Sequence, residues 1–401
     1  MKKVLFLSAL DFKEKSIQVI RKTPESYVIA GWEVNCLVAR DNCPDGNYFY
    51  EDEINIDGVN VTRFYWPFPK VRSYAGRYLG LLLSKLASLI VIIRLFAKAK
   101  KLLKSNQYDV IYGYELQGVL AMNLLKPFLP KRTKLVSRFQ GSFLNEMFVN
   151  KQVLRVIFNL DLVLAIRANS DLLIMTDDGT QGDQAVRKIK GKKPYNMVFW
   201  TNGVDLLPKK LGKPFEKSSS LTFMSVSRLV GWKRVDRNLH ILNKFLELGY
   251  TDFVYYIIGE GEQKAYLEEL CNCLGLQKNV IFVGALSHSS VTSFLLNADI
   301  FLSMYDSSNV GNPLLEAIRA NKIIVTLDNG DTGKWIQHKK HGLIYDPKNI
   351  DYSVIAKDMY NLIYDENMKC EILNNVRVLE KTKILTWDER LGKEVTTVGA
   401  L

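Results

Sequence analysis

The sequence predicts an α/β protein built from two Rossmann-like domains. A chain of 401 residues is too long for one ordinary hydrophobic core. Short apolar runs rich in β-branched residues alternate with stretches of helical periodicity, which favours βα units and parallel sheets. Two sets of such units flank residues 206–220, which contain Pro, Lys and Ser without periodicity and are typical of a linker.

Six strands are expected in each half of the chain. In the first half they are residues 3–10, 33–40, 109–114, 134–141, 171–178 and 196–203, and in the second half 221–229, 252–261, 279–287, 299–305, 322–328 and 341–346. Helices are expected between them, for example at 234–249, 262–275 and 289–297. The N-terminal apolar run is interpreted as the first strand, not as a signal peptide, because it lacks a small-residue cleavage site and becomes charged at once.

The net charge of +12 lies entirely in the first half. Residues 1–200 contain 30 Lys and Arg against 18 Asp and Glu, whereas residues 201–401 contain 24 of each. Such asymmetry indicates an anionic partner, either nucleic acid or a membrane surface. Nucleic acid is not expected, because no recognition motif accompanies the basic half. Five cysteines, few and odd in number, suggest a reducing compartment.

Residues 74–105 form a long, apolar and basic segment. Its longest uncharged run around the middle, Leu86 to Ile93, is shorter than the ~20 residues that a spanning helix needs. Basic residues at 94, 98 and 101 recur at helical spacing, and a helix of this type can lie in a membrane interface. The alternative is a crossover helix packed on the sheet with its Lys stems along apolar surface. The two interpretations do not exclude each other.

The stretch DSSNVGNPLLEA (306–317) joins a polar loop to an apolar run. Asn312 is a good N-cap and Pro313 suits the first helical position, so a helix is expected to begin here. Its free N–H groups would face whatever lies above Ser308 to Gly311, and such a helix end favours an anion. The alternative is an ordinary strand–loop–helix connection that binds nothing.

Two cations are expected at the same edge of the second sheet. Arg228 ends one strand and Lys233 precedes the next helix, and ligands of parallel α/β sheets lie at the carboxyl ends of the strands. Together with a helix N-terminus they would form a cradle for a diphosphate. Gly259 and Gly261 lack the third glycine of a dinucleotide fingerprint. With no Asp-x-Asp pair, His/Cys cluster or P-loop in the sequence, neither a metal nor a cofactor is expected.

The second half resembles the donor domain of retaining GT-B glycosyltransferases of family 4 (glycosyl transferases group 1). The first half matches in layout but only weakly in motif. The matching segments, in chain order, are TNGVD (201–205), SRLVGWKRVD (227–236), IIGEGEQK (257–264), VIFVGALS (280–287), NVGNPLLEAIRANKIIV (309–325), HGLIYDP (341–347) and LTWDERLGKEV (385–395).

This resemblance implies a fold and a set of site residues. Residues 1–205 would form an acceptor domain completed by a helix at about 385–401, and residues 206–384 the donor domain. Glu316 would bind the ribose hydroxyls of a nucleotide-sugar, and Arg228 and Lys233 would neutralise its diphosphate. The base would be held largely by main chain at Gly284, Ala285 and Leu286, and the sugar and β-phosphate by Ser308, Asn309, Val310, Gly311, Asn312, Pro313, Leu314 and Leu315.

Three positions depart from the family pattern. Ser308 stands where a second Glu is usual, so the sugar contact would come from a hydroxyl or pass to Asn309. Gln140 stands where the acceptor domain commonly has a His, and it cannot act as a base. The glycine-rich loop after the first strand is absent. Glu115 is a spare carboxylate at the same edge as Gln140, or a helix-start acid favoured by the helix dipole.

The resemblance therefore implies a retaining, metal-independent hexosyltransferase that uses a UDP- or GDP-sugar. The expected acceptor is a lipid-linked saccharide in cell-surface polysaccharide or glycolipid synthesis. The protein would be cytoplasmic and peripherally attached to an anionic inner membrane face. Two alternatives stay open: a nucleotide-sugar 2-epimerase, against which the absence of histidine from the first half counts, and a non-catalytic scaffold protein, which Ser308 and Gln140 favour.

Overall fold

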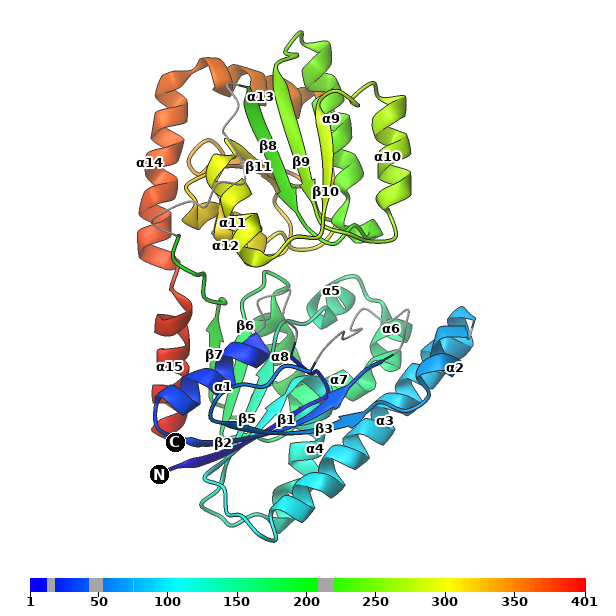
Figure 1. The fold of residues 1–401 in the computed structure, drawn as a ribbon, viewed down its shortest axis with the longest axis vertical. Coiled ribbons are helices and arrows are strands. Elements are labelled where there is room, and N and C mark those ends of the chain that lie inside the picture. The colour runs from blue at the N-terminus through cyan, green and yellow to red at the C-terminus, as the bar shows by residue number, and fades with distance from the viewer. Residues whose placement is uncertain (13–18, 43–52, 75, 208–219) are drawn as a thin grey trace. The chain divides into compact units, whose positions relative to one another are not determined.

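A computed structural model describes residues 1–12, 19–42, 53–74, 76–207 and 220–401. The chain divides into two compact units (Figure 1). The first unit comprises residues 1–177, 181–202 and 387–401, and the second comprises residues 178–180 and 203–386. Most of the expected linker, residues 208–219, lies outside the described residues.

The first unit contains a seven-stranded parallel sheet in the order β3-β2-β1-β4-β5-β6-β7. All six strands predicted in this half are confirmed, and β3 was missed. Only Phe64 of its alternating sequence VNVTRFY is buried, because β3 is an edge strand and not a fully buried run. The strands are β1 (Lys3–Ser8), β2 (Glu33–Arg40), β3 (Val59–Tyr65), β4 (Val110–Tyr114), β5 (Lys134–Phe139), β6 (Leu172–Thr176) and β7 (Met197–Trp200).

Helices cover both faces of this sheet, as Figure 1 shows. One face is buried under α1 and α15, with Tyr27 and Val398 in its core. The other is buried under α3, α4, α7 and α8, with Val91 and Val119 in its core. The helices are α1 (Val19–Ile29), α2 (Pro69–Tyr74), α3 (Arg77–Leu102), α4 (Glu115–Leu125), η1 (Lys126–Phe128), α5 (Leu144–Val149), α6 (Val153–Phe158), α7 (Leu160–Arg167), α8 (Gly182–Lys190) and α15 (Trp387–Gly399).

The helix predicted within 74–105 is α3. Its residues Leu79–Leu102, with a mean hydropathy of 2.1 in an 18-residue window, are long and apolar enough to cross a membrane by length and composition. The expectation that this segment falls short of a spanning helix was therefore wrong, because isolated charges do not lower the average enough. Nevertheless Ala87, Val91 and Leu95 are fully buried in the core of the first unit, so one face of α3 is packed on protein.

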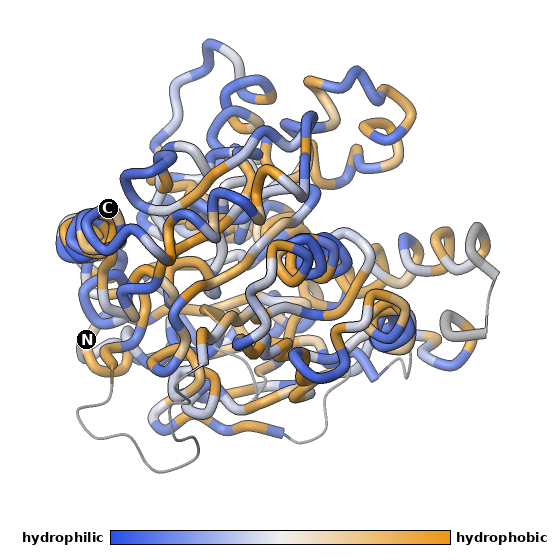
Figure 2. The backbone as a smooth tube through the Cα atoms, turned by 90° about the horizontal axis from the view of Figure 1, so that it is seen from above, coloured by the Kyte–Doolittle hydropathy of each residue, from blue (hydrophilic) through white to orange (hydrophobic). Residues whose placement is uncertain are grey.

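The second unit contains a six-stranded parallel sheet in the order β10-β9-β8-β11-β12-β13 around one core. All six strands and the three helices predicted in this half are confirmed. Figure 2 shows hydrophobic and hydrophilic stretches alternating along the backbone of both units. The elements are β8 (Leu221–Val226), η2 (Gly231–Lys233), α9 (Val235–Glu247), β9 (Phe253–Ile258), α10 (Lys264–Cys273), β10 (Val280–Gly284), α11 (His288–Asn297), β11 (Ile300–Ser303), α12 (Asn312–Arg319), β12 (Ile323–Leu327), η3 (Thr332–Lys334), β13 (Gly342–Tyr345), α13 (Tyr352–Tyr364) and α14 (Glu366–Lys383).

Both sheets reverse their strand order at one point. In the first sheet the reversal lies between β1 and β4, and in the second between β8 and β11. Doubly wound α/β sheets bind ligands outside the carboxyl ends of the strands at such a reversal. The loops after β8 and β11 are therefore the first place to look for a site in the second unit.

Candidate functional site

The loop after β8 carries both predicted cations. Arg228 is exposed, and Lys233 ends the short helix η2. The Nζ of Lys233 lies 4.1 Å from the centroid of the Trp232 ring and 3.7 Å from that of Tyr305. Burial of the ammonium, assisted by the nearby charge of Arg228, lowers the pKa of Lys233 to about 7. An arriving anion would favour the protonated form, so this amine is suited to respond to a bound phosphate.

The two glycines of the loop after β9 allow close approach of backbones. A Cβ on Gly259 would collide with the carbonyl oxygen of Ser227, and one on Gly261 would collide with that of Leu229. The N–H of Leu229 donates to the carbonyl of Glu260 at 3.0 Å. These glycines thus hold the loop after β8 against its neighbour and place Arg228 and Lys233.

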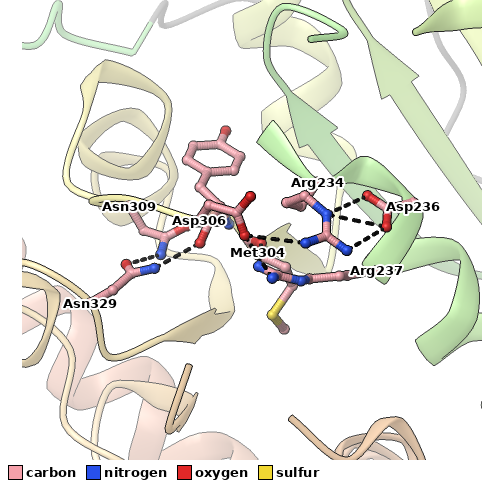
Figure 3. A network of polar contacts seen from close by, with 8 residues as sticks. Arg234, Asp236, Arg237, Met304, Asp306, Asn309 and Asn329 are labelled. Atoms are coloured by element: carbon pink, nitrogen blue, oxygen red, sulfur yellow. Dashed lines mark hydrogen bonds and ion pairs between the residues drawn. The ribbon is translucent and has the colours of Figure 1, made fainter. Parts of the chain in front are cut away.

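A network of polar contacts joins the loop after β11 to the start of α9 (Figure 3). The guanidinium of Arg237 donates to the carbonyl of Met304 at 2.8 Å and lies 2.6 Å from the carboxylate of Asp306. Arg234 contacts both Asp306, at 3.3 Å, and Asp236, at 2.9 Å. The two loops at the reversal point are consequently held together by charged hydrogen bonds.

Asn309 is buried, and its side chain fastens the loop after β11. Its Oδ1 accepts hydrogen bonds from the hydroxyl of Ser303 at 3.0 Å and the N–H of Tyr305 at 3.1 Å. Its Nδ2 donates to the Oδ1 of Asn329 at 2.7 Å (Figure 3) and to the carbonyl of Leu327 at 3.3 Å. With four bonds already made, this amide shapes the loop, and a contact to a sugar would require breaking some of them.

The hydroxyl of Ser308 accepts a hydrogen bond from the N–H of Val310 at 3.0 Å. The side chains of Val310, Leu314 and Leu315 are buried in the core. At these three positions only the backbone is available to a ligand.

Helix α12 begins one residue earlier than predicted. Gly311 is its N-cap, without a side-chain hydrogen bond, so Asn312 is the first helical residue and Pro313 the second. Asn312 was therefore wrongly expected to cap this helix. The first-turn N–H groups have no acceptor within the helix, and the helix dipole adds partial positive charge there. A helix end of this kind favours an anion.

Glu316 lies one turn into α12 and is only 12% exposed. Its Oε1 is 3.8 Å from Nδ1 of His288, whose Nε2 is 3.4 Å from a carboxylate oxygen of Asp205. Burial raises the pKa of Glu316 to about 7, His288 opposes that shift, and Asp205 adds to it. Sequence reasoning missed His288 and Asp205 as site residues. Asp205 was visible in the TNGVD segment, whereas His288 carried no signal.

The three residues expected to hold a base follow the end of β10. Gly284 ends that strand with φ +83°, and its carbonyl accepts from the N–H of Gly259 at 2.9 Å. Ala285 is exposed and Leu286 is half-buried. They lie at the carboxyl edge of the second sheet.

In the first unit the structure brings Glu115 and Gln140 together. Glu115 opens α4 with φ +58°, which is strained for a residue with a side chain. Its Oε1 accepts from the backbone N–H of Gln140 at 2.6 Å, and the Gln140 amide donates to the hydroxyl of Tyr114 at 2.6 Å. Glu115 thus opens a helix and also fixes the residue that follows β5.

Two Rossmann-like units with these strand orders define the GT-B fold. Residues 208–377 match the family model described as "Glycosyl transferases group 1". This segment, which is less than half of the chain, is thus similar to the glycosyl transferases group 1 family.

Several known glycosyltransferases are similar to part of this chain. An uncharacterized glycosyltransferase of Methanocaldococcus jannaschii is 30% identical over 177 residues, which cover 43% of each chain. A 2-deoxystreptamine N-acetyl-D-glucosaminyltransferase of Niallia circulans is 27% identical over 117 residues, which cover 29% of this chain and 30% of that protein. The matches thus span less than half the length of these curated relatives. The crystal structure of Anabaena HepE in complex with UDP-glucose is similar over the whole of both chains, with a TM-score of 0.69 at 16% identity, and shares the fold.

Proposed function

We propose that the protein is a retaining, metal-independent glycosyltransferase that uses a nucleotide-diphosphate sugar. One observation carries this proposal: the ammonium of Lys233 lies against the loop that leads into helix α12, at the point where the strand order of the second sheet reverses. The Nζ of Lys233, after β8, lies 3.7 Å from the centroid of the Tyr305 ring, which follows β11 and precedes the N-terminus of α12. A diphosphate is the group whose charge and size suit two cations and a helix N-terminus.

The donor would be bound along the carboxyl edge of the second sheet. Arg228 and Lys233 contact the diphosphate, the carboxylate of Glu316 accepts from the ribose hydroxyls, and His288 positions that carboxylate. Main chain at Gly284, Ala285 and Leu286 holds the base. A UDP-sugar is favoured by the likeness to HepE, which was solved with UDP-glucose, and a GDP-sugar is the other candidate.

Transfer breaks the bond between the anomeric carbon and the β-phosphate oxygen and forms a bond to an acceptor hydroxyl on the same face of the sugar. The proton of that hydroxyl passes to the leaving phosphate oxygen, so Gln140 is not required as a base. Negative charge grows on the diphosphate in the transition state. Fixed donors near it, Arg228 and Lys233 among them, stabilise that state more than the ground state.

The proposed acceptor is a lipid-linked saccharide at the inner membrane face, bound near Glu115 and Gln140 in the first unit. The basic excess of residues 1–200 and the apolar helix α3 support a cytoplasmic protein attached peripherally to an anionic membrane. The fold is shared with WaaG, a glycosyltransferase involved in lipopolysaccharide biosynthesis, over 98% of this chain with a TM-score of 0.69 at 15% identity, which is compatible with a lipid acceptor.

Incubation of the protein with radiolabelled UDP-glucose, UDP-N-acetylglucosamine or GDP-mannose and a membrane extract tests the proposal. Label transferred to the lipid fraction is expected from at least one donor. An epimerised donor without transfer would identify an epimerase instead. Neither product, together with retained donor binding, would indicate a non-catalytic scaffold.

A further inference from the structure

Helix α3 presents a second apolar stripe that the fold does not use. Five side chains recur every three or four residues along it and are 47–62% exposed: Leu79, Leu82, Leu86, Leu89 and Ile93. This spacing places them on one line of the helix, opposite the buried stripe that contains Val91 and Leu95. These five side chains are not part of the hydrophobic core that packs against α3. The stripe is therefore available to a binding partner.

The short helices α6 and α7 add a second group of exposed apolar side chains. Their exposed fractions range from 43% to 83%, highest at Leu154. Water-facing residues of this size and number are unusual on an ordinary surface. The group consists of Val153, Leu154, Ile157, Phe158, Leu160 and Leu164.

One lysine links the two groups. The Nζ of Lys85, on α3, is 2.8 Å from the carboxylate of Asp161 on α7 and lies 5.0 Å from the centroid of the Phe158 ring at the end of α6. Through Lys85, α3 therefore adjoins the junction of α6 and α7, and Figure 1 shows the three helices in the same unit. We call this combined area the α3–α6–α7 face.

The positive charge around this face favours an anionic partner. Residues 77–105 contain seven Lys and Arg and no Asp or Glu. Near the end of α3, the Nζ of Lys100 lies 3.8 Å from the centroid of the exposed Phe128 ring, so its stem lies along apolar surface. Two copies of the chain meeting through this face would bring two sets of cations together. An anionic bilayer offers both a hydrocarbon layer and opposite charge.

We propose that the α3–α6–α7 face docks the first unit onto an anionic lipid bilayer, with α3 lying in the plane of the interface. The buried residues Ala87 and Val91 hold the opposite side of α3 on the protein core, which excludes a spanning orientation for the folded unit. At about 1.5 Å per residue, α3 would lie along roughly 39 Å of membrane surface. Helices α6 and α7 would enter the interface beside it.

This placement also bears on the acceptor, and here the inference rests on the proposed function. Gln140 directly follows β5, Phe143 is 54% exposed three residues later, and α5 leads from there to α6. The chain thus runs directly from the expected acceptor site to the docking face. A lipid-linked saccharide would reach Glu115 and Gln140 from the bilayer, and a soluble saccharide would have no need of this face.

Flotation of the full-length protein with liposomes tests the docking. One set contains phosphatidylcholine alone, and the other contains phosphatidylcholine with about one-third phosphatidylglycerol. The variants are Leu82→Ser/Leu86→Ser on α3 and Leu154→Ser/Ile157→Ser on α6. The matched control is Val354→Ser/Val378→Ser, which replaces two comparably exposed residues of the second unit.

We expect the wild-type protein and the control to float with the anionic liposomes and to bind neutral ones weakly. Each face variant should lose at least about tenfold in partitioning, because docking uses both helices. Loss in the α3 variant alone would overturn the joint face, and no loss in either would overturn docking altogether. A wild-type dimer by light scattering that both variants break, without flotation, would assign the face to a second copy.

Titration of the same variants with nucleotide-sugars separates this inference from the proposed function. The face variants should bind donor as the wild type does, because their substitutions lie in the other unit. Flotation without any donor binding would leave the docking standing and refute the proposed function. Donor binding without flotation would refute the docking and leave the use of a nucleotide-sugar donor standing.

Discussion

Raising the pH should weaken donor binding through Lys233. Its ammonium lies over the rings of Trp232 and Tyr305, and burial beside Arg228 lowers its pKa from the ordinary 10.5 to about 7. In the free protein the amine is charged below about pH 7 and largely neutral above it. A bound diphosphate favours the charged form, so the pKa in the complex must lie above that of the free protein. The contribution of Lys233 to the affinity is then fully present below pH 7 and falls as the pH rises toward the pKa of the complex.

The size of the effect follows from this linkage. Within that window the affinity falls about tenfold for each pH unit, so between pH 7 and pH 9 the loss reaches up to about 100-fold. The assay is calorimetric titration of the tightest-binding nucleotide-sugar, whose diphosphate diester keeps its charge over this range. The matched control is Lys233→Arg, which stays charged and should lose this dependence. Equal wild-type affinities at pH 7 and pH 9, or an equally steep fall in Lys233→Arg, would refute the reasoning.

Four further predictions follow from the same geometry. Burial raises the pKa of Glu316 to about 7, so if its carboxylate accepts from a ribose, its contribution to donor affinity should grow from pH 6 to pH 7 and level off above; in Lys233→Arg, which removes the opposing fall, this rise should be seen, and adding Glu316→Gln should abolish it. Ser308→Ala should lower turnover modestly and Glu316→Ala severely; equal, negligible effects would favour a scaffold. Asn309→Ala should lower the free energy of unfolding by about 3 kcal/mol in urea, since four hydrogen bonds are lost, and a change near zero would contradict its structural role. Turnover should survive EDTA, and a loss restored by Mg²⁺ or Mn²⁺ would contradict the metal-independent mechanism.

Most strands and helices of the fold could be predicted from local sequence patterns. Twelve of the parallel strands are mostly apolar runs, which is why they were predicted from the sequence. The edge strand β3 was missed because its residues alternate and only one is buried. The start of α12 was misplaced by one residue because Asn312 has good capping chemistry, whereas the backbone conformation puts Gly311 at the cap.

The site was harder to predict where it depends on contacts between distant segments. Arg228 and Lys233 could be named from strand ends, but the rings that bury Lys233 could not, since Tyr305 is far away in the sequence. His288 approaches Glu316 only because α11 and α12 pack together. Only the α3 part of the α3–α6–α7 face could be recognised from the sequence, as an apolar, basic helix. Its second half became apparent only once α6 was seen to expose its apolar side chains.

Calorimetric titration of nucleotide-diphosphate sugars is the most direct test of the central claim, which is that the loops after β8 and β11 bind a diphosphate. UDP-glucose, UDP-N-acetylglucosamine and GDP-mannose would each be titrated into the wild-type protein and into Arg228→Ala at pH 7. We expect at least one to bind and to lose about 100-fold or more in affinity in the variant, the usual scale for removing a charged partner from a phosphate. Binding of none of the three, or equal binding by wild type and Arg228→Ala, would contradict the claim.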